Sequence, residues 1–180
     1  MKSALVIIDM QRALCVGEWA MADVDRVIER INTLSARARA ASIPVFLVQH
    51  EEGEGPLRFA AEGWQLADTL AIAPGDHRVR KTTPNSFHDT DLHEMLQERG
   101  VERLVVCGLQ SDFCVDTTVR QALALGYEVA LPSDAHATMD NGVLKAAQIV
   151  AHHNATLANM TSFGPRVAVV PATEVKMEAS

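Results

Sequence analysis

The sequence predicts an α/β protein with three layers, in which helices cover both faces of a mostly parallel, doubly wound sheet of about six strands. Short apolar runs without polar alternation, such as residues 4–8 and 104–107, are typical of strands buried on both faces. Segments with apolar residues at helical spacing separate these runs, and this alternation of strands and helices favours a parallel sheet. The 180 residues are expected to form one domain, 1–180.

The first half of the chain is expected to contain three strands and two helices. SALVIID and IPVFLVQH form the first two strands, and a helix with Asp23 as its candidate N-cap lies between them. The segment 51–75 has Gly and Pro near its ends and is expected to be a loop with at most a short helical turn. HRVRK is a short strand, and the helix in HDTDLHEMLQERG ends at Gly100.

The second half continues the alternation. VERLVVCG is a strand, and the next helix is expected from about Cys114 to Leu125, where Gly126 ends it. YEVALPSDA contains another strand, and NGVLKAAQIVAHHN is helical. ATLAN and RVAVVP are each candidates for a last short strand.

Charge and cysteine content exclude several classes of protein. A net charge of -7 argues against nucleic acid or an anionic membrane as the main partner. The first apolar run ends at Asp9, which makes it too short for a signal-peptide core, so we expect a cytoplasmic protein. Cys15, Cys107 and Cys114 form no CxxC pair, which argues against a disulfide framework and against a structural zinc site.

Three chemically active residues fall at the ends of predicted strands. Asp9 follows the first strand, Lys81 ends HRVRK, and Cys114 comes shortly after VERLVVCG. The carboxyl ends of parallel strands meet at one edge of a sheet, where ligands bind in such folds. Taken singly, each residue also fits a structural role: a capping Asp, a surface Lys or a small buried Cys. The start of a helix, however, favours a thiolate.

The same three stretches resemble the isochorismatase-like hydrolases, also called cysteine hydrolases. IIDMQ contains Asp9, RKTTPNSF contains Lys81 and GLQSDFCVDTTVRQAL contains Cys114, and the likeness extends over nearly the whole chain. The resemblance implies that Cys114 is the nucleophile, Asp9 the general base and Lys81 the cation that holds the charges in place. A nearby lysine and a helix N-terminus are expected to lower the thiol pKa. The Asp9 carboxylate by itself would raise that pKa, so Lys81 is expected to balance it.

The resemblance also implies an arrangement of the backbone before the cysteine. The peptide bond between Leu109 and Gln110 is expected to be cis, which turns the Gln110 N–H toward the site. The N–H groups of Gln110 and Cys114 would then form an oxyanion hole. In the implied reaction the thiolate attacks a carbonyl, an amine leaves, and water hydrolyses the resulting thioester.

The resemblance narrows the reaction further. Family members that act on isochorismate lack the cysteine, so Cys114 favours cleavage of a carbon–nitrogen bond. Nicotinamidase-type members have a metal site that begins with an acid, but Gln49 stands at that place, and no histidine follows His50 until His77. We therefore expect no metal and no cofactor. The expected activity is a metal-independent amidohydrolase acting on a small amide, a ureido or carbamoyl compound, or a lactam.

Several side chains near these motifs are candidates for binding the small-molecule substrate, namely Gln11, His50, Trp64, Ser86, Phe87 and Phe113. A homodimer or homotetramer is expected from the resemblance. Two alternatives within the family stay open, a non-catalytic member and a metal-assisted amidase of the nicotinamidase type. A dinucleotide-binding domain would need GxGxxG where DMQRALCVG stands, and a thiol-redox protein would usually carry CxxC.

Overall fold

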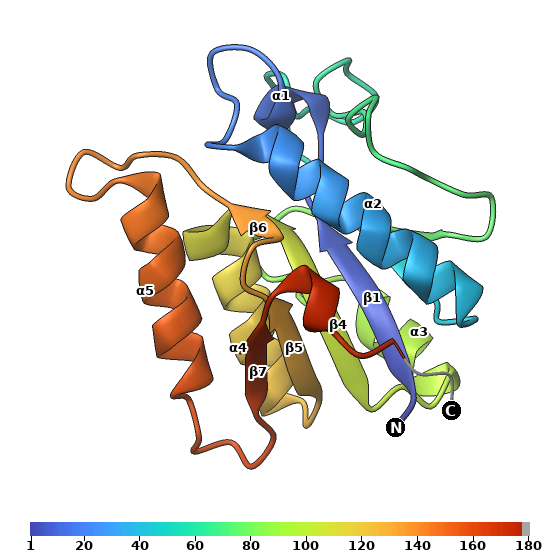
Figure 1. Cartoon of the computed structure of the whole chain (residues 1–180). Helices are drawn as coiled ribbons and strands as arrows, with labels where there is room; N and C mark the ends of the chain where they lie inside the picture. Colours follow the sequence, from blue (N-terminus) through green and yellow to red (C-terminus); the bar gives the residue numbers. More distant parts are fainter. Residues whose placement is uncertain (178–180) are drawn as a thin grey trace.

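The computed structural model describes residues 1–177, and within them it forms a seven-stranded sheet with helices on both faces (Figure 1). The strands are β1 Ser3–Ile8, β2 Val45–His50, β3 His77–Lys81, β4 Arg103–Leu109, β5 Glu128–Pro132, β6 His136–Ala137 and β7 Val167–Val170. The helical elements are α1 Arg12–Cys15, α2 Val24–Ala40, α3 Leu92–Glu98, the π-helical turn η1 Ser111–Val115, α4 Asp116–Ala124, α5 Ala146–Ala158 and the 3-10 turn η2 Ala172–Glu174.

The strand order shows where a site belongs. The order is β3-β2-β1-β4-β5-β7, with β6 beside the end of β4, and all of these pairings are parallel. The chain builds outward from β1 in one direction and then from β4 in the other. The switch point of this doubly wound sheet therefore lies between the carboxyl ends of β1 and β4, where such folds bind ligands.

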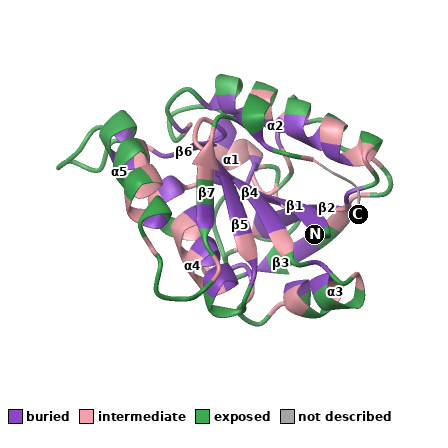
Figure 2. Ribbon diagram, turned by 60° about the horizontal axis from the view of Figure 1, so that its bottom comes forward, coloured by how far each residue is buried: buried purple, intermediate pink, exposed green. Residues whose placement is uncertain are grey.

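The side chains of the central strands form two separate cores, one on each face of the sheet. Leu5 and Ile7 of β1 belong to the core beneath α2, whereas Val6 and Ile8 belong to the core beneath α3 and α4. Figure 2 shows β1 and β4 buried along most of their length, with the exposed residues of α2 on its outer face. The predicted three-layer α/β/α architecture is confirmed.

Four local features differ from what the sequence suggested. Asp23 occupies the predicted N-cap position of α2, but its backbone is left-handed (φ 52°) and its side chain makes no capping hydrogen bond. ATLAN continues α5 instead of forming a strand. The two-residue strand β6 has no sequence periodicity and was not predicted. The helix containing Cys114 begins earlier, because η1 starts at Ser111 and passes directly into α4.

The helices of the described residues were also considered as membrane spans by their length and hydropathy. Among residues 1–177, no helix has the length and apolar character needed to cross a membrane.

Candidate active site

The folded chain brings the three predicted reactive side chains together at the switch point. The Lys81 ammonium lies 2.8 Å from Asp9 Oδ2 and 3.2 Å from Cys114 Sγ. Lys81 ends β3, which is two strands away from β1, so its long side chain reaches past the end of β2 to arrive at Asp9. The ammonium thus bridges a carboxylate and a thiol that come from different segments of the chain.

The ion pair between Lys81 and Asp9 is enclosed by protein. The Lys81 and Asp9 side chains are 0% and 2% exposed. Charges removed from water in this way are tolerated only when paired. The second carboxylate oxygen of Asp9, Oδ1, is buried and has no hydrogen-bond partner among the described residues. An unengaged carboxylate oxygen beside a thiol is a suitable acceptor for a proton.

The Cys114 thiol has a different acidity from the one that the sequence suggested. Burial and then the negative charge of Asp9 raise the pKa of Cys114 to about 12, and the opposing effect of Lys81 is smaller. The balance expected between Asp9 and Lys81 is therefore not reached, because burial and Asp9 together outweigh Lys81. A thiol with a raised pKa needs a base to form a thiolate.

His50 supports the ammonium from the end of β2. Its Nδ1 lies 3.2 Å from Lys81 Nζ, and because an ammonium only donates, Nδ1 acts as the acceptor. Its Nε2 lies 4.0 Å from the carboxylate of Glu52. Burial and the neighbouring Lys81 charge lower the pKa of His50, so the ring stays neutral. The predicted site residue His50 thus contacts the catalytic cluster through Lys81.

The backbone before Cys114 contains one glycine in a left-handed conformation and one cis peptide bond. Gly108 has φ +114°, and a Cβ atom there would lie 2.1 Å from the Ile8 carbonyl oxygen, so only glycine fits. The Leu109–Gln110 peptide bond is cis. The Gln110 carbonyl then accepts hydrogen bonds from the N–H groups of Phe113 (3.2 Å) and Val115 (3.0 Å). These contacts close the η1 turn that carries Cys114.

Two of the predicted substrate-binding residues have their polar atoms engaged within the protein. The Gln11 amide donates to the carbonyls of His50 (2.9 Å) and Trp64 (3.0 Å) and accepts from the His50 N–H (2.8 Å). The Ser86 hydroxyl is fully buried and accepts a hydrogen bond of 2.8 Å from Thr118. The polar atoms of Gln11 and Ser86 are therefore engaged in the framework around the site.

The three aromatic candidates have different surroundings. Phe87 stacks on Tyr127, with ring centroids 6.1 Å apart, and packs against the core beneath α3 and α4. Trp64 packs edge-on against Phe59 at 4.9 Å. Phe113 lies in η1 next to Cys114 and is 54% exposed, so among these rings it is the one available at the surface of the nucleophile turn.

A hollow of about 890 Å³ borders the site, and Gln110 forms part of its wall. Its other lining residues come mainly from the loop after α1 and from the segment 51–75, together with Met139. The apolar ones are Ala13, Leu14, Val16, Trp19, Met21, Pro56, Leu57 and Met139, and the charged ones are Arg12, Glu52, Glu62 and Asp68. Val16 and Trp19 of this lining were not among the substrate-binding residues predicted from the sequence, because exposed apolar residues in a loop follow no periodic pattern.

The last feature of the site concerns side chains that could hold a metal ion. Within residues 1–177, the structure gathers no group of three or more His, Cys, Asp and Glu side chains arranged to hold a metal ion.

The fold and the site together define a doubly wound α/β domain with an aspartate, a lysine and a cysteine at its switch point. The isochorismatase domain family model matches residues 3–174, and the chain belongs to this family. The predicted family resemblance is thereby confirmed.

Two named proteins and one solved structure are similar to this chain over most of its length. A streptothricin hydrolase of Streptomyces noursei is 37% identical in an alignment of 176 positions that covers 93% of this chain and 64% of that protein. The ureidoacrylate amidohydrolase RutB of Pseudomonas syringae pv. syringae is 30% identical in an alignment of 172 positions that covers 74% of this chain and 70% of that protein. The solved structure of an isochorismatase from Pseudomonas putida KT2440 superposes with a TM-score of 0.87 at 34% identity, covering 97% of this chain and 90% of the other.

Proposed function

We propose that this chain is a metal-independent cysteine amidohydrolase that cleaves the C–N bond of a small amide, a ureido or carbamoyl compound, or a lactam. The observation that carries the proposal is the buried contact of Lys81 with both Asp9 and Cys114. The names of two relatives, a streptothricin hydrolase and a ureidoacrylate amidohydrolase, support hydrolysis of this kind.

The first step is activation of the nucleophile. Cys114 rests as a thiol, and the unpartnered Oδ1 of Asp9 accepts its proton when a substrate carbonyl approaches. Lys81 stays charged and stabilises the thiolate as it forms. A bond forms between Sγ and the carbonyl carbon, and the carbonyl electron pair moves to oxygen. The N–H groups of Gln110 and Cys114 are the proposed donors to this oxyanion.

The second part of the reaction releases the products. The C–N bond breaks, and the leaving nitrogen takes the proton that Asp9 had accepted, which leaves a thioester on Cys114. Asp9 then removes a proton from water, and the hydroxide attacks the thioester carbon. The C–S bond breaks and the thiolate recovers its proton. One base thus serves both halves of the reaction.

The hollow beside Gln110 is the proposed place for the part of the substrate that does not react. Trp19 and its apolar neighbours would contact it. Arg12 forms ion pairs with Glu62 and Asp68, so Glu52 is the lining carboxylate that would favour a polar or cationic group over an anionic one. A small-molecule partner and a homodimeric or homotetrameric assembly are part of the same proposal.

The proposal is tested by measuring ammonia release from a panel of small amides. The panel contains ureidoacrylate, biuret, maleamate, nicotinamide and carbamoyl compounds, and mass spectrometry follows ring opening of lactams and hydrolysis of streptothricin. Wild type and Cys114→Ser are compared in the presence and absence of a chelator. Turnover that is lost in Cys114→Ser and unaffected by the chelator supports the proposal. Turnover that the chelator abolishes, or that Cys114→Ser retains, contradicts it.

A further inference from the structure

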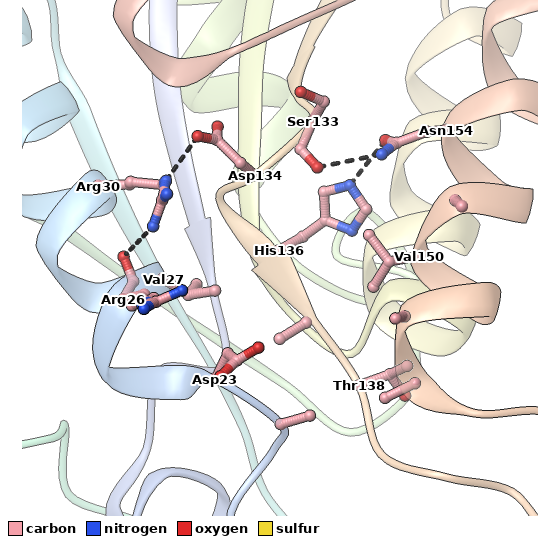
Figure 3. Close-up of a pocket in the computed structure, with 15 residues that line it drawn as sticks. Asp23, Arg26, Val27, Arg30, Ser133, Asp134, His136, Thr138, Val150 and Asn154 are labelled. Carbon is pink, nitrogen blue, oxygen red and sulfur yellow. Dashed lines mark hydrogen bonds and ion pairs between the residues drawn. The ribbon is translucent and has the colours of Figure 1, made fainter.

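His136 is a buried polar side chain behind the nucleophile turn and outside the triad. His136 is 2% exposed. Its backbone pairs with that of Gly108, where β6 lies beside the end of β4. Its Nδ1 lies 2.8 Å from the Ser111 hydroxyl, and its Nε2 lies 2.9 Å from Asn154 Oδ1. Figure 3 shows the ring on β6 turned toward Asn154 of α5, on the wall of a hollow of about 370 Å³.

The neighbours of His136 fix the direction of each hydrogen bond. The Asn154 amide nitrogen donates to the Ser133 carbonyl at 3.0 Å, so its Oδ1 faces the histidine as an acceptor (Figure 3). Nε2 of His136 must therefore carry the proton, and Nδ1 must be the acceptor. It follows that the Ser111 hydroxyl donates to Nδ1. Burial lowers the pKa of His136, which keeps the ring in this neutral form.

Ser111 is placed to transmit this contact to the reactive groups. It is fully buried, it is the first residue of η1, it directly follows Gln110, and it comes three residues before Cys114. A second bond runs parallel to the first, because the Thr138 hydroxyl donates to Asp112 Oδ1 at 2.6 Å. The turn is thus held to β6 and the residue after it by two side-chain hydrogen bonds.

We propose that His136, acting through Ser111, is a positioning residue that sets where the Gln110 N–H and the Cys114 thiol lie relative to Lys81 and Asp9. The inference rests on the function proposed above for Cys114. It assigns to a neutral, fully hydrogen-bonded cluster the task of holding the turn that carries the nucleophile. A displacement of about 1 Å in such a group reduces kcat by about 100-fold.

Two variants of His136 separate the bond to Ser111 from the bond to Asn154. In His136→Asn the side-chain oxygen reaches the place of Nδ1 and still accepts from Ser111. In His136→Gln the amide nitrogen reaches the place of Nε2 and donates to Asn154, but nothing accepts from Ser111. We expect His136→Gln and Ser111→Ala to lose about 100-fold in kcat with little change in KM. His136→Asn and Ser111→Thr should retain most of the wild-type kcat.

A substrate-free measurement keeps this test independent of the proposed hydrolysis. Alkylation of Cys114 by iodoacetamide at neutral pH is followed by mass spectrometry, well below the unfolding temperature of each variant. Loosening the turn exposes the thiol and lowers its pKa, so His136→Gln and Ser111→Ala should react several-fold faster than wild type, whereas His136→Asn and Ser111→Thr should not. His152→Gln, at an exposed histidine of α5, is the matched control.

The alkylation rates of the variants decide whether His136 acts through Ser111. Faster alkylation confined to the two variants that lose the Ser111 bond supports the inference, even if no amide of the panel is hydrolysed. Equal alkylation rates in all variants, or an equal change in His136→Asn and His136→Gln, would overturn it.

Discussion

Two polar clusters are buried at the same edge of the sheet, and they differ in what they leave unsatisfied. The cluster of Asp9, Lys81 and Cys114 contains a full ion pair and a carboxylate oxygen without a partner in the described chain. The cluster of Ser111, His136 and Asn154 is neutral, and each of its ring and amide contacts is a hydrogen bond of 2.8–3.0 Å. We therefore expect the charged cluster to transfer a proton and the neutral one to hold the turn in place.

The largest expected effect is the loss of the nucleophile from the charged cluster. Cys114→Ala should reduce kcat for any hydrolysed amide by about 10⁴-fold or more, because no other group can form the thioester. The unfolding temperature should change little, since Cys114 is only partly buried. Steady-state kinetics and thermal unfolding check this. The matched variant Cys15→Ala removes a buried thiol from α1, and retention of turnover there assigns the loss to Cys114.

The next effect is the cost of breaking the buried ion pair. Asp9→Asn should reduce kcat by about 10²–10⁴-fold because the base is lost. It should also lower the free energy of unfolding by about 3–5 kcal/mol, because Lys81 is left charged in a buried site. Asp140→Asn, which breaks an exposed ion pair with Lys145, is the control for stability and should lower it far less than Asp9→Asn does.

A double variant sharpens the same comparison. Lys81→Met alone leaves Asp9 buried without its counter-ion, whereas Asp9→Asn combined with Lys81→Met removes both charges. The double variant should be more stable than the sum of the single effects predicts, as expected for partners in one buried pair. Denaturant unfolding of the four proteins gives the coupling. If the losses in free energy of unfolding of the two single variants add up to that of the double variant, the contact between Asp9 and Lys81 makes no contribution of its own.

The free energy of unfolding should depend on pH through His136 of the neutral cluster. The folded-state pKa of His136 lies below the ordinary value of 6.5, mainly because of burial. Below pH 6.5 the unfolded chain therefore binds a proton that the folded chain does not, and stability falls as the pH falls. His136→Asn does not titrate, so its loss of stability between about pH 6.5 and 5 should be smaller than that of wild type. Parallel curves for the two proteins would contradict this assignment.

The smallest effect is expected in the hollow beside the site. Trp19→Ala removes an exposed aromatic ring from its wall, so KM should rise by about 10-fold while kcat stays near the wild-type value. Ile72→Ala, at an exposed apolar residue outside this lining, is the control. A fall in kcat with no change in KM would show that Trp19 acts on the reacting groups instead.

The two clusters also differ in how far the sequence could predict them. Asp9 and Cys114 come after buried apolar runs and Lys81 ends the short strand HRVRK, so the parallel-sheet pattern places all three at one edge. His136 lies in a two-residue strand, which is too short to show periodicity, and its partners Ser111 and Asn154 are far from it in sequence. Such a contact arises only when β6 has docked beside β4.

Contacts of single side chains were harder to predict than their position near the motifs. The polar atoms of Gln11 and Ser86 hold loop backbone and Thr118, contacts that no sequence pattern shows. For Cys114, the sequence placed Asp9 and Lys81 as opposing influences on the thiol pKa. It could not show how deeply the folded chain buries the thiol, and burial is the largest cause of the raised pKa.

The central claim is that Cys114 rests as a thiol and that Asp9 takes its proton. The most direct test is the rate of iodoacetamide alkylation of Cys114 as a function of pH, in wild type and in Asp9→Asn. Slow alkylation of wild type at neutral pH, with an apparent pKa well above the ordinary 9.0, and faster alkylation of Asp9→Asn are the predicted results, because the Asp9 charge raises the pKa of Cys114. Rapid alkylation of wild type at pH 7, with no change in Asp9→Asn, would contradict the claim.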